Sequence, residues 1–354
     1  MLPQELDICL TNRCNMRCAY CYARARNIKT GPELSLKTVE RAMLLYLKGC
    51  AAAGVVPEKI SVSGGEPLLR ASVLYALAGR FRGPCARRAA LEVFTNGLLL
   101  TPAAAARLLV PGVALKLSLD GDGADRGGRA LESGAASQAA VLERARRLSA
   151  AQRRRVWVSA TVTRANARRF GANMKFLLGE GFGRISPSFA VEENWSRSEY
   201  AALTAEFRDF KKFLRSAPAR HRSAFCGFTV KLTGPGPASL EEFTRTNEIS
   251  LAPDGFFYPC SILSASAAAM SRKFNDEYRM GSVRAGIDAE KFLKLRRRAH
   301  AEIAAYGRRR YPGCLMCVYY MSKVNSAPLA PLLAGAGRLA ELAFEAGLAA
   351  RREN

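Results

Sequence analysis

The sequence has few histidines and a shortage of acidic residues. Only two histidines occur, His221 and His300, so histidine-rich zinc sites and histidine-based acid–base catalysis have little to draw on. The sequence has 30 acidic and 54 basic residues, which gives a formal net charge of +24 and predicts anionic partners. The arginines are spread widely and interleaved with alanine, as on solvated helix faces. No recognisable nucleic-acid-binding module accompanies them, so nucleic acid is not the expected partner.

Segments that would direct the chain to a membrane or out of the cell are also missing. The start, MLPQELDICL, carries Glu5 and Asp7 where a secretory signal needs a basic residue and then an apolar run. The longest apolar segment, near the C-terminus, is interrupted by Arg338, Glu341 and Glu345, so we expect an amphipathic helix there. The sequence therefore predicts a cytoplasmic protein with no membrane partner.

Cysteine is comparatively abundant, with ten residues. Disulfides are not expected, because reducing compartments keep thiols reduced. Three cysteines are scattered and are interpreted as structural: Cys9, Cys50 and Cys85. The other seven fall into two groups and are candidate metal ligands: Cys14, Cys18 and Cys21, then Cys226, Cys260, Cys314 and Cys317.

The first two hundred residues alternate strand-like and helix-like segments, which indicates a parallel βαβ architecture. Six strands are expected, in the segments LDICLT, KISVSGG, LEVFTNG, VALKLSLDG, VWVSATVT and RISPSFAVE. Six are too few for a complete eight-fold barrel. The predicted fold class is α/β, a partial (β/α)6 barrel open on one side, which would suit a large substrate.

Downstream, a helix over about 198–214 is expected from its apolar stripe, and Pro253 to Gly255 are expected to form the turn of a hairpin. Four regions are predicted. They are the barrel (1–197), a connecting helix and linker (198–225), a small cysteine-bearing region (226–320) and a terminal helix (321–354).

The stretch LTNRCNMRCAYCYARA places Cys14, Cys18 and Cys21 at C-x3-C-x2-C spacing on one loop. Three thiolates on a cubane iron–sulfur cluster leave one iron without a protein ligand, open to a substrate or cofactor. The alternative is a structural zinc ion completed by a remote fourth cysteine.

The neighbouring sequence resembles radical S-adenosylmethionine (SAM) enzymes. Their C-x3-C-x2-C motif follows the first strand and usually has an aromatic residue before its last cysteine, here Tyr20. A second family motif follows the second strand, where SVSGGEPLL supplies Gly64, Gly65, Glu66 and Pro67. The resemblance implies a [4Fe-4S] cluster on the three cysteines and SAM on its open iron, with the backbone of the second motif holding the SAM amino group.

Further matches extend the resemblance over residues 4 to about 195. In the peptide-modifying branch of the family, residues at these strand ends line the SAM pocket: Thr95, Asn96, Ser118, Asp120 and Asn166. Ordinary capping of the strand ends is the alternative for Ser118, Asp120 and Asn166. The family often shows D-x-x-R here, but Asp125 and Arg129 are one residue too far apart, so Arg129 or Arg126 is the candidate for the SAM carboxylate.

The second cysteine group resembles the SPASM and twitch extensions of the family, which carry auxiliary [4Fe-4S] clusters. APDGFFYPC matches their G-x4-C element with Gly255 and Cys260, and YPGCLMC supplies Cys314 and Cys317. With Cys226 these thiols suffice for one fully ligated cluster, as in the shorter twitch form. A zinc site built from the same four cysteines is the alternative.

The resemblance implies reductive cleavage of SAM to a 5′-deoxyadenosyl radical, which abstracts hydrogen from a substrate carbon. Three functions are weighed: maturation of a ribosomally made peptide or a protein side chain, a small-molecule dehydrogenase or epimerase of the aminoglycoside type, and a non-catalytic iron–sulfur or zinc interaction protein. The first is favoured. An external flavodoxin- or ferredoxin-type electron donor is implied. Because the chain starts directly at its first strand, a peptide substrate is expected to need either a separate peptide-recognition protein or contacts from the twitch-like region. No catalytic residue is assigned, and Glu192, Glu193 and Asp254 are candidates by position only.

Overall fold

The computed structural model describes most of the chain. The described residues are 2–23, 28–81, 89–123, 128–131, 133–228, 230–232, 248–305, 310–312 and 315–349. Within these ranges, 230–232, 310–312 and 315–316 are described by their backbone alone.

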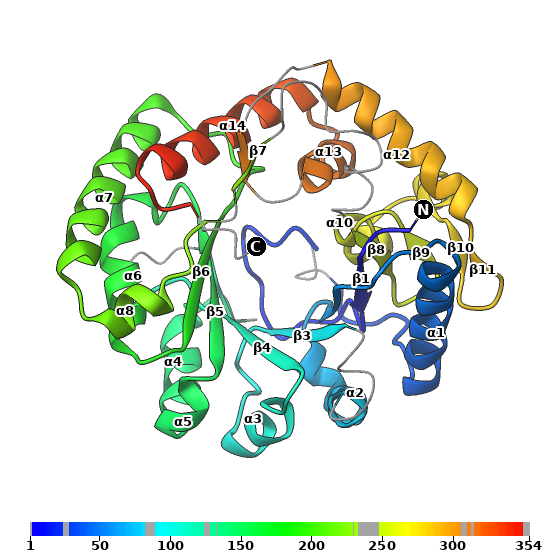
Figure 1. The fold of residues 1–354 in the computed structure, drawn as a ribbon, viewed down its shortest axis with the longest axis horizontal. Helices are drawn as coiled ribbons and strands as arrows, with labels where there is room; N and C mark the ends of the chain where they lie inside the picture. Colours follow the sequence, from blue (N-terminus) through cyan, green and yellow to red (C-terminus); the bar gives the residue numbers. More distant parts are fainter. Residues whose placement is uncertain are drawn as a thin grey trace.

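A single curved sheet of eight strands forms the centre of the molecule, in the order β6-β5-β4-β3-β2-β1-β8-β9 (Figure 1). All neighbouring pairs are parallel except β8 and β9. The six predicted strands and the partial-barrel fold are confirmed. The bounds are β1 (Glu5–Cys9), β2 (Lys59–Ser63), β3 (Ala90–Thr95), β4 (Val113–Ser118), β5 (Val156–Val162), β6 (Arg184–Phe189), β8 (Glu248–Leu251) and β9 (Phe257–Tyr258).

Helices cover the outer side of this sheet (Figure 1). The first begins after Ser35, whose hydroxyl accepts a hydrogen bond from the amide of Thr38 at 3.1 Å. Its apolar face is buried through Val39, Met43 and Tyr46. The helices between the strands are α1 (Leu36–Ala52), η2 (Pro67–Arg70), α2 (Ala71–Arg80), α3 (Pro102–Leu108), α4 (Gln138–Arg146), α5 (Ala150–Arg153), η4 (Ala167–Arg169) and α6 (Phe170–Gly179).

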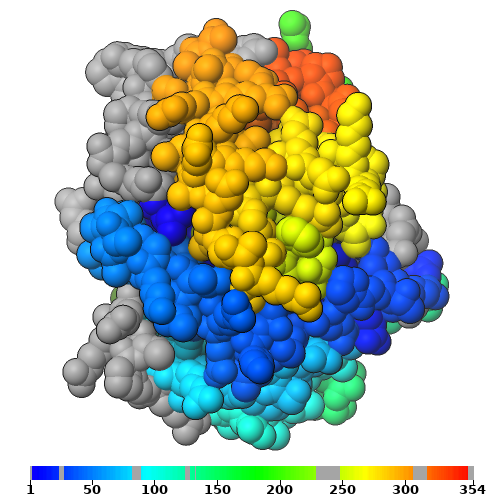
Figure 2. All heavy atoms as spheres, turned by 90° about the vertical axis from the view of Figure 1, so that its right-hand side faces the viewer, coloured from blue at the N-terminus to red at the C-terminus, as the bar shows by residue number. Residues whose placement is uncertain are grey.

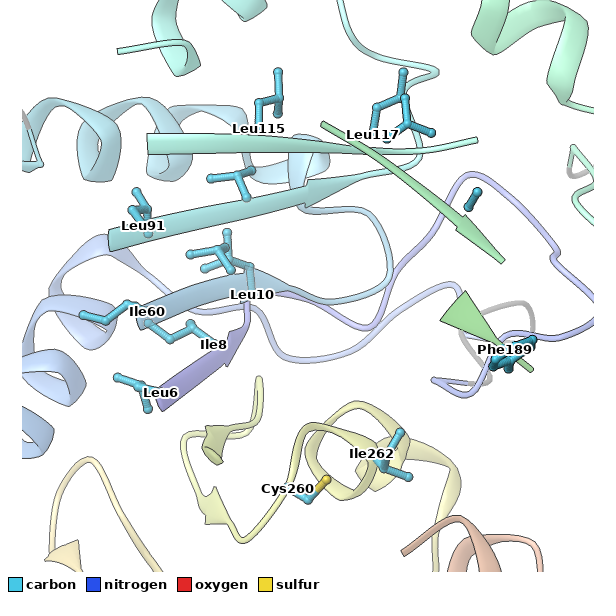
Figure 3. Packing of buried hydrophobic residues seen from close by; sticks show 14 of the residues in the cluster. Leu6, Ile8, Leu10, Ile60, Leu91, Leu115, Leu117, Phe189, Cys260 and Ile262 are labelled. Atoms are coloured by element: carbon cyan, nitrogen blue, oxygen red, sulfur yellow. The ribbon is translucent and has the colours of Figure 1, made fainter. Parts of the chain in front are cut away.

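Successive residues of the sheet strands point to opposite faces. The outward side chains form the core against the helices and are apolar, as Leu6, Ile8, Ile60, Leu91 and Leu115 show (Figure 3). The inward side chains are largely polar. The barrel therefore encloses a polar interior inside a hydrophobic shell.

The predicted hairpin is present, and it extends the main sheet. Glu248 to Leu251 pair in parallel with Glu5 to Ile8 of β1, and β9 returns antiparallel to β8. Gly255 forms its turn with φ +82°, a conformation that favours glycine. The cysteine-bearing C-terminal region thus continues the barrel wall beside the first strand.

The remaining elements close the open side of the barrel. In Figure 1, α12, α13 and α14 run across the side opposite β3 and β4. Figure 2 shows residues of this region (yellow and orange) seated on α1 (blue), where Arg41 Nη2 donates to the Arg284 carbonyl at 3.3 Å. These elements are α7 (Arg197–Ser216), α8 (Ala219–Ala224), β7 (Val230–Leu232), α10 (Ser261–Ser266), η5 (Ala267–Ala269), α11 (Arg272–Tyr278), β10 (Gly281–Ser282), β11 (Gly286–Ile287), α12 (Ala289–Ala304), β12 (Arg310–Pro312), α13 (Leu315–Val324) and α14 (Leu329–Glu345).

The terminal helix α14 has the amphipathic character expected from the sequence. Leu333, Leu339 and Leu342 on one face are buried, whereas Arg338 and Glu341 are paired at the surface. Among the described helices, none is long and apolar enough to span a membrane.

Candidate functional site

The cysteine loop, residues 14–21, follows β1 and lies over the carboxyl ends of the central strands. Backbone hydrogen bonds fix it to the segment 128–131: the amide of Arg17 donates to Ala130 at 2.8 Å, and that of Ala19 donates to Gly128 at 2.6 Å. Its three thiols, Cys14, Cys18 and Cys21, are half-buried and line one cavity of about 380 Å³. The structure thus brings together the three predicted ligands.

The glycine turn, Gly64 to Pro67, follows β2 and presses against the start of the cysteine loop. The amide of Gly65 donates to the Thr11 carbonyl at 2.7 Å. A Cβ atom on Gly64 would lie 2.5 Å from the Thr11 oxygen, and one on Gly65 would lie 2.1 Å from the Arg13 oxygen. Glycine is needed here because the two backbones touch, a reason beyond the ligand approach expected from the sequence.

Glu66 connects the ends of β2 and β3 from inside the protein. Its fully buried carboxylate accepts hydrogen bonds from the Leu68 amide at 2.9 Å, the Thr95 hydroxyl at 2.8 Å and the Asn96 amide at 2.7 Å. Burial raises the pKa of Glu66, and these donors oppose the rise. Glu66 also lines the cavity, and its hydrogen bonds hold together the segments that follow β2 and β3.

Asn96 links the third strand to the cysteine loop. Its Nδ2 donates to Asn15 Oδ1 at 2.7 Å and approaches Cys14 Sγ at 3.7 Å. Thr95 and Ser118, at the ends of β3 and β4, line the same cavity. These three predicted residues therefore surround the thiols, and contact with SAM stays a prediction.

A buried trio of polar side chains lies behind the loop. Arg129 Nη1 donates to the Tyr20 hydroxyl at 2.9 Å, and that hydroxyl donates to the Asp120 carboxylate, which also accepts the Thr161 amide at 2.9 Å. Arg129 is 7% exposed and lines the cavity, and its Nε has no hydrogen-bond partner among the described residues. Arg129 is thus the arginine that the structure places here. Asp125 and Arg126 lie outside the described residues.

Asp120 and Asn166 are not among the residues that line the cavity. Asn166 Oδ1 accepts the Thr163 amide at 2.8 Å, and its Nδ2 donates to the Thr161 carbonyl at 2.8 Å. These bonds match the strand-end capping that was the alternative for both residues. Their role toward SAM stays a prediction.

Beneath the thiols, the cavity is walled by hydroxyl groups around one carboxylate, Asp7, that the sequence analysis did not select. Ser63 Oγ contacts both Asp7 oxygens at 3.0 and 3.1 Å, and Ser250 Oγ contacts one at 2.9 Å. Burial, with Glu248 nearby, raises the pKa of Asp7 to about 7. The serine and threonine residues of the wall are Ser61, Ser63, Thr95, Ser118, Ser159, Thr161, Ser188 and Ser261.

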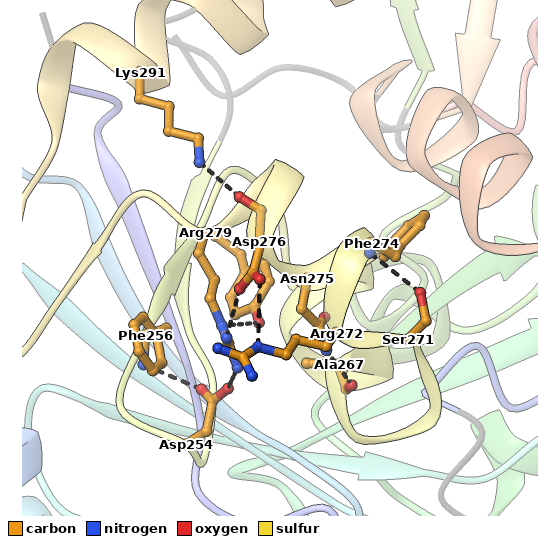
Figure 4. Close-up of polar contacts among 11 residues, drawn as sticks. Asp254, Phe256, Ala267, Ser271, Arg272, Phe274, Asn275, Asp276, Arg279 and Lys291 are labelled. Carbon is orange, nitrogen blue, oxygen red and sulfur yellow. Dashed lines mark hydrogen bonds and ion pairs between the residues drawn. The ribbon is translucent and has the colours of Figure 1, made fainter.

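Of the three carboxylates proposed by position, only Glu192 faces this cavity. Burial, together with the charge of Glu193, raises the pKa of Glu192 to about 7. Glu193 Oε2 accepts a hydrogen bond from the backbone amide of Arg164 at 2.6 Å. Asp254 is at the hairpin turn, where it accepts from Arg279 at 2.9 Å, away from the cavity (Figure 4).

A second hollow of about 440 Å³ shares part of its lining with the first. Tyr22, Glu192 and Met321 belong to both, and Glu193 and Asn325 extend the second toward α13. The polar cavity and this hollow are therefore neighbours, and Cys21 of the cysteine loop lines both.

The C-terminal cysteines gather only in part. A carboxylate oxygen of Glu248 and the sulfur atoms of Cys260 and Cys317 all lie within 4.8 Å of one another. Cys226 is not in this group. It lies beside β6, where its amide donates to the Ile185 carbonyl at 2.9 Å and its thiol approaches the Ala224 carbonyl at 3.7 Å. Cys314 lies outside the described residues.

The cysteines interpreted as structural are consistent with that assignment where they are described. Cys50 is fully buried beside Tyr46 in the core. Cys9 is also fully buried, packs with Ala23 and Ala265, and has its thiol 3.3 Å from Asn12 Oδ1. Cys85 lies outside the described residues.

Curated relatives match the chain over short segments. A GTP 3′,8-cyclase of Geobacter sulfurreducens is 37% identical over 129 residues, 34% of this chain and 35% of that protein. The GTP 3′,8-cyclase of Pelotomaculum thermopropionicum is 40% identical over 125 residues, again 34% and 35%. The chain therefore spans about a third of the length of these relatives.

Solved structures share the fold over more of the chain. Hexahistidine-tagged anSMEcpe with bound AdoMet has a TM-score of 0.61 at 17% identity, covering 97% of each chain. SuiB of Streptococcus suis with S-adenosylmethionine has a TM-score of 0.51 at 14% identity, covering 74% of this chain and 61% of that one. The family model described as the Radical SAM superfamily matches residues 8–176. The matched residues contain both the cysteine loop and the glycine turn.

Proposed function

We propose that this protein is a radical SAM enzyme that modifies a peptide or protein side chain. When bound, a [4Fe-4S] cluster supplies the electron that cleaves SAM into methionine and the 5′-deoxyadenosyl radical, which takes a hydrogen atom from a substrate carbon. The observation that carries the proposal is the single cavity shared by three half-buried thiols, the glycine turn and Arg129. The described residues fit both cofactors.

The thiols fit a cluster with one open iron. Cys14, Cys18 and Cys21 come from one loop, and all three face the cavity. Burial raises the pKa of Cys14 to about 12 and raises that of Cys18, so both are protonated at neutral pH without metal. Metal binding must therefore displace their protons.

The surroundings of the thiols fit a ligand with a carboxylate and an amino group. Arg129 is a buried cation whose Nε has no hydrogen-bond partner among the described residues, and an anionic group in the cavity would satisfy it. The backbone of Gly64 to Pro67 lines the opposite part of the cavity. Tyr20 and Asp120 hold Arg129 in position, and α10 and α13 contribute Ser261 and Met321 to the wall that limits water access.

The lower cavity is suited to a polar substrate group. Its hydroxyls can donate or accept hydrogen bonds, and Asp7 and Glu192 are carboxyls that titrate near neutral pH. Either one can take up or release a proton when hydrogen abstraction is followed by deprotonation of the substrate. These two are the acid–base candidates that the structure supports.

Three observations support a peptide substrate. Two neighbouring cavities of about 380 and 440 Å³ adjoin the cysteine loop, which offers space for more than one residue of a peptide. The net charge of +24 favours an acidic partner. The fold is similar to that of anSMEcpe with bound AdoMet and Cp18Cys peptide, with a TM-score of 0.59 at 18% identity. The proposal includes an external flavodoxin- or ferredoxin-type electron donor and a separate peptide-recognition protein.

An auxiliary iron–sulfur cluster in the C-terminal region is also part of the proposal. The proximity of Cys260 and Cys317 supports it. A fully ligated cluster there would accept an electron from the substrate radical, since no iron would be open for the substrate.

A small-molecule substrate is the second candidate, favoured by the identity of 33 to 43% to GTP 3′,8-cyclases over about a fifth to a third of the chain. In this version the basic residues would attract a nucleoside triphosphate. The two candidates share the SAM chemistry and differ in what occupies the lower cavity.

The test is anaerobic reconstitution with iron and sulfide, reduction with dithionite, and measurement of 5′-deoxyadenosine. We expect product from the native chain and none from the C14A/C18A/C21A variant. A fully loaded native protein that forms none would overturn the proposal in favour of a non-catalytic metal protein. Mass spectrometry then decides the substrate. A mass change in a short acidic peptide encoded beside the gene supports the peptide function, and conversion of GTP supports the second candidate.

A further inference from the structure

Glu248, Cys260 and Cys317, here called the auxiliary group, come from three elements that are distant in sequence. Glu248 is the first residue of β8, Cys260 directly precedes α10, and Cys317 is in the first turn of α13. Figure 3 shows Cys260 at the entrance of α10, beside the barrel. Ligands of one tetrahedral ion with metal–sulfur bonds of about 2.3 Å lie roughly 3.8 Å apart. In the auxiliary group, Cys260 Sγ and Glu248 Oε1 lie 3.7 Å apart, and all three ligand atoms lie within 4.8 Å of one another.

The Glu248 carboxylate is held toward the two sulfur atoms. Its Oε1 accepts a hydrogen bond from the Ser261 amide at 2.8 Å and lies 3.7 Å from Cys260 Sγ. The register of β8 on β1 fixes its backbone, because Glu248 pairs with Glu5. A carboxylate fixed in this way is a preorganised oxygen ligand.

Arg296 supplies an independent observation at the same place. This arginine of α12 is fully buried, and its Nη2 donates to the carbonyls of Glu248 at 2.5 Å and Pro259 at 2.7 Å. Its Nε and Nη1 are buried with no hydrogen-bond partner among the described residues. A buried guanidinium with two unsatisfied nitrogens is costly unless an anionic group lies nearby. Metal-bound thiolates and a carboxylate form such a group.

Cys226, the fourth ligand predicted from sequence, is attached to the opposite end of the sheet. Its amide bonds to β6, which is the outermost strand on one side, whereas Glu248 lies on β8 and Cys260 follows β9 at the other. Glu248 therefore offers the ligand atom that Cys226 was predicted to supply.

We propose that Glu248, Cys260 and Cys317 bind a metal centre in which the Glu248 carboxylate replaces Cys226 as a ligand and the buried Arg296 balances the negative charge. This inference deepens the proposed auxiliary centre by naming its oxygen ligand. Thiolate and carboxylate donors suit iron or zinc, and the metal that copurifies identifies which one is held.

The experiment uses the full chain with C14A/C18A/C21A as background, which removes the first site. Glu248→Ala, Glu248→Gln, Cys226→Ser and Glu5→Gln are added one at a time. Each protein is incubated anaerobically with iron and sulfide, or with zinc alone, and desalted. Iron, sulfide and zinc are then counted per chain, and iron samples are examined by EPR after reduction. Glu5→Gln is the matched control, because Glu5 pairs with Glu248 in the strand register but lies outside the auxiliary group.

We expect Glu248→Ala to lose at least half of the bound metal, whereas Cys226→Ser and Glu5→Gln retain the background level. Glu248→Gln keeps the shape of the side chain, so it is expected to fold normally and to lower the metal content or change the EPR signal. Unchanged content and signal in a folded Glu248→Gln protein would overturn the proposal. So would loss of metal in Cys226→Ser, or no iron or zinc bound by the background protein.

Cleavage of SAM by the otherwise native chain is measured separately. A chain that binds metal through Glu248 but forms no 5′-deoxyadenosine keeps this inference and refutes the proposed function. Conversely, the native chain could cleave SAM while the Glu248→Ala and Glu248→Gln variants bind metal normally. That result would support the proposed function and refute this inference.

Discussion

The cysteine loop takes its three thiols from the eight consecutive residues 14–21, whereas the auxiliary group takes its ligands from Glu248, Cys260 and Cys317. In the first region, one turn after one strand presents all the ligands to a cavity. In the second, the packing of β8, α10 and α13 must be complete before the ligands meet. The loop can therefore be recognised from sequence, whereas the auxiliary group becomes visible only in the folded protein.

The largest effect should separate the two regions. Cys18→Ala should abolish 5′-deoxyadenosine formation, because it removes a ligand that no neighbouring side chain replaces. Cys226→Ser, a thiol change beside β6, should leave SAM cleavage within about twofold of native. The measurement is product per loaded cluster by liquid chromatography. Equal activity of both variants would contradict the claim that SAM cleavage needs Cys18 but not Cys226.

Arg129→Met should weaken SAM binding next. Loss of one charge-assisted hydrogen bond from a buried site costs about 1.5–3 kcal/mol, so the KM for SAM should rise about 10- to 100-fold. Arg129→Lys should recover part of this loss because it keeps the charge. The control is Arg146→Met, since Arg146 is exposed and pairs with Glu180. An unchanged KM in Arg129→Met would remove Arg129 from the SAM site.

Gly65→Ala should have a smaller effect, a loss of stability caused by a clash between the glycine turn and the cysteine loop. The added Cβ would lie 2.1 Å from the Arg13 oxygen, so the loop must shift at a cost of about 1–3 kcal/mol. Urea unfolding measures this cost. Gly79→Ala in α2 is the matched control, since no atom lies within 4 Å of its Cβ position, and it should be neutral or slightly stabilising. Equal stability of the two variants would contradict the contact.

The last effect appears only as a dependence on pH, in the stability that Asp7 contributes. Its pKa is about 7 in the folded chain and 3.8 when unperturbed, so the folded state holds the extra proton between these values. Asp7 therefore stabilises the fold below about pH 4, and this contribution is lost as pH rises to 7. Asp7→Asn should flatten the fall in unfolding free energy over that range, by up to a few kcal/mol. Parallel pH profiles of the native and variant chains would show that Asp7 does not titrate in this way.

Much of the fold could be predicted from the sequence, because local signals and the final structure agree. Ser35 caps α1, the six predicted strands form in parallel order, and Gly255 makes the hairpin turn. That β8 joins β1 could not be predicted. Its four residues are as compatible with a separate hairpin as with the barrel edge, and only the tertiary packing decides.

In the candidate site, too, the residues that could be predicted lie in short sequence motifs, and the others depend on the folded structure. The cysteine loop and glycine turn were visible because their chemistry lies within short, fixed spacings. Asp7 was missed, although the polar–apolar alternation of ELDIC and KISVS carried a signal for a polar barrel interior. Glu248 and Arg296 carried none, since their importance depends on burial and on Cys260. Cys226 was selected by counting thiols, and its position beside β6 depends on the folded chain.

Helix α10 touches both candidate metal sites. Cys260 directly precedes it, and at its other end Ser266 Oγ donates to the Tyr22 carbonyl at 3.1 Å while Ala265 packs near Cys14 and Cys21. Its six residues make a rigid rod about 9 Å long. If both candidate sites hold the proposed iron–sulfur clusters, the length of α10 would help to set the distance between them, and electron tunnelling slows exponentially with distance. Lengthening α10 by one turn would then slow electron transfer between the two clusters.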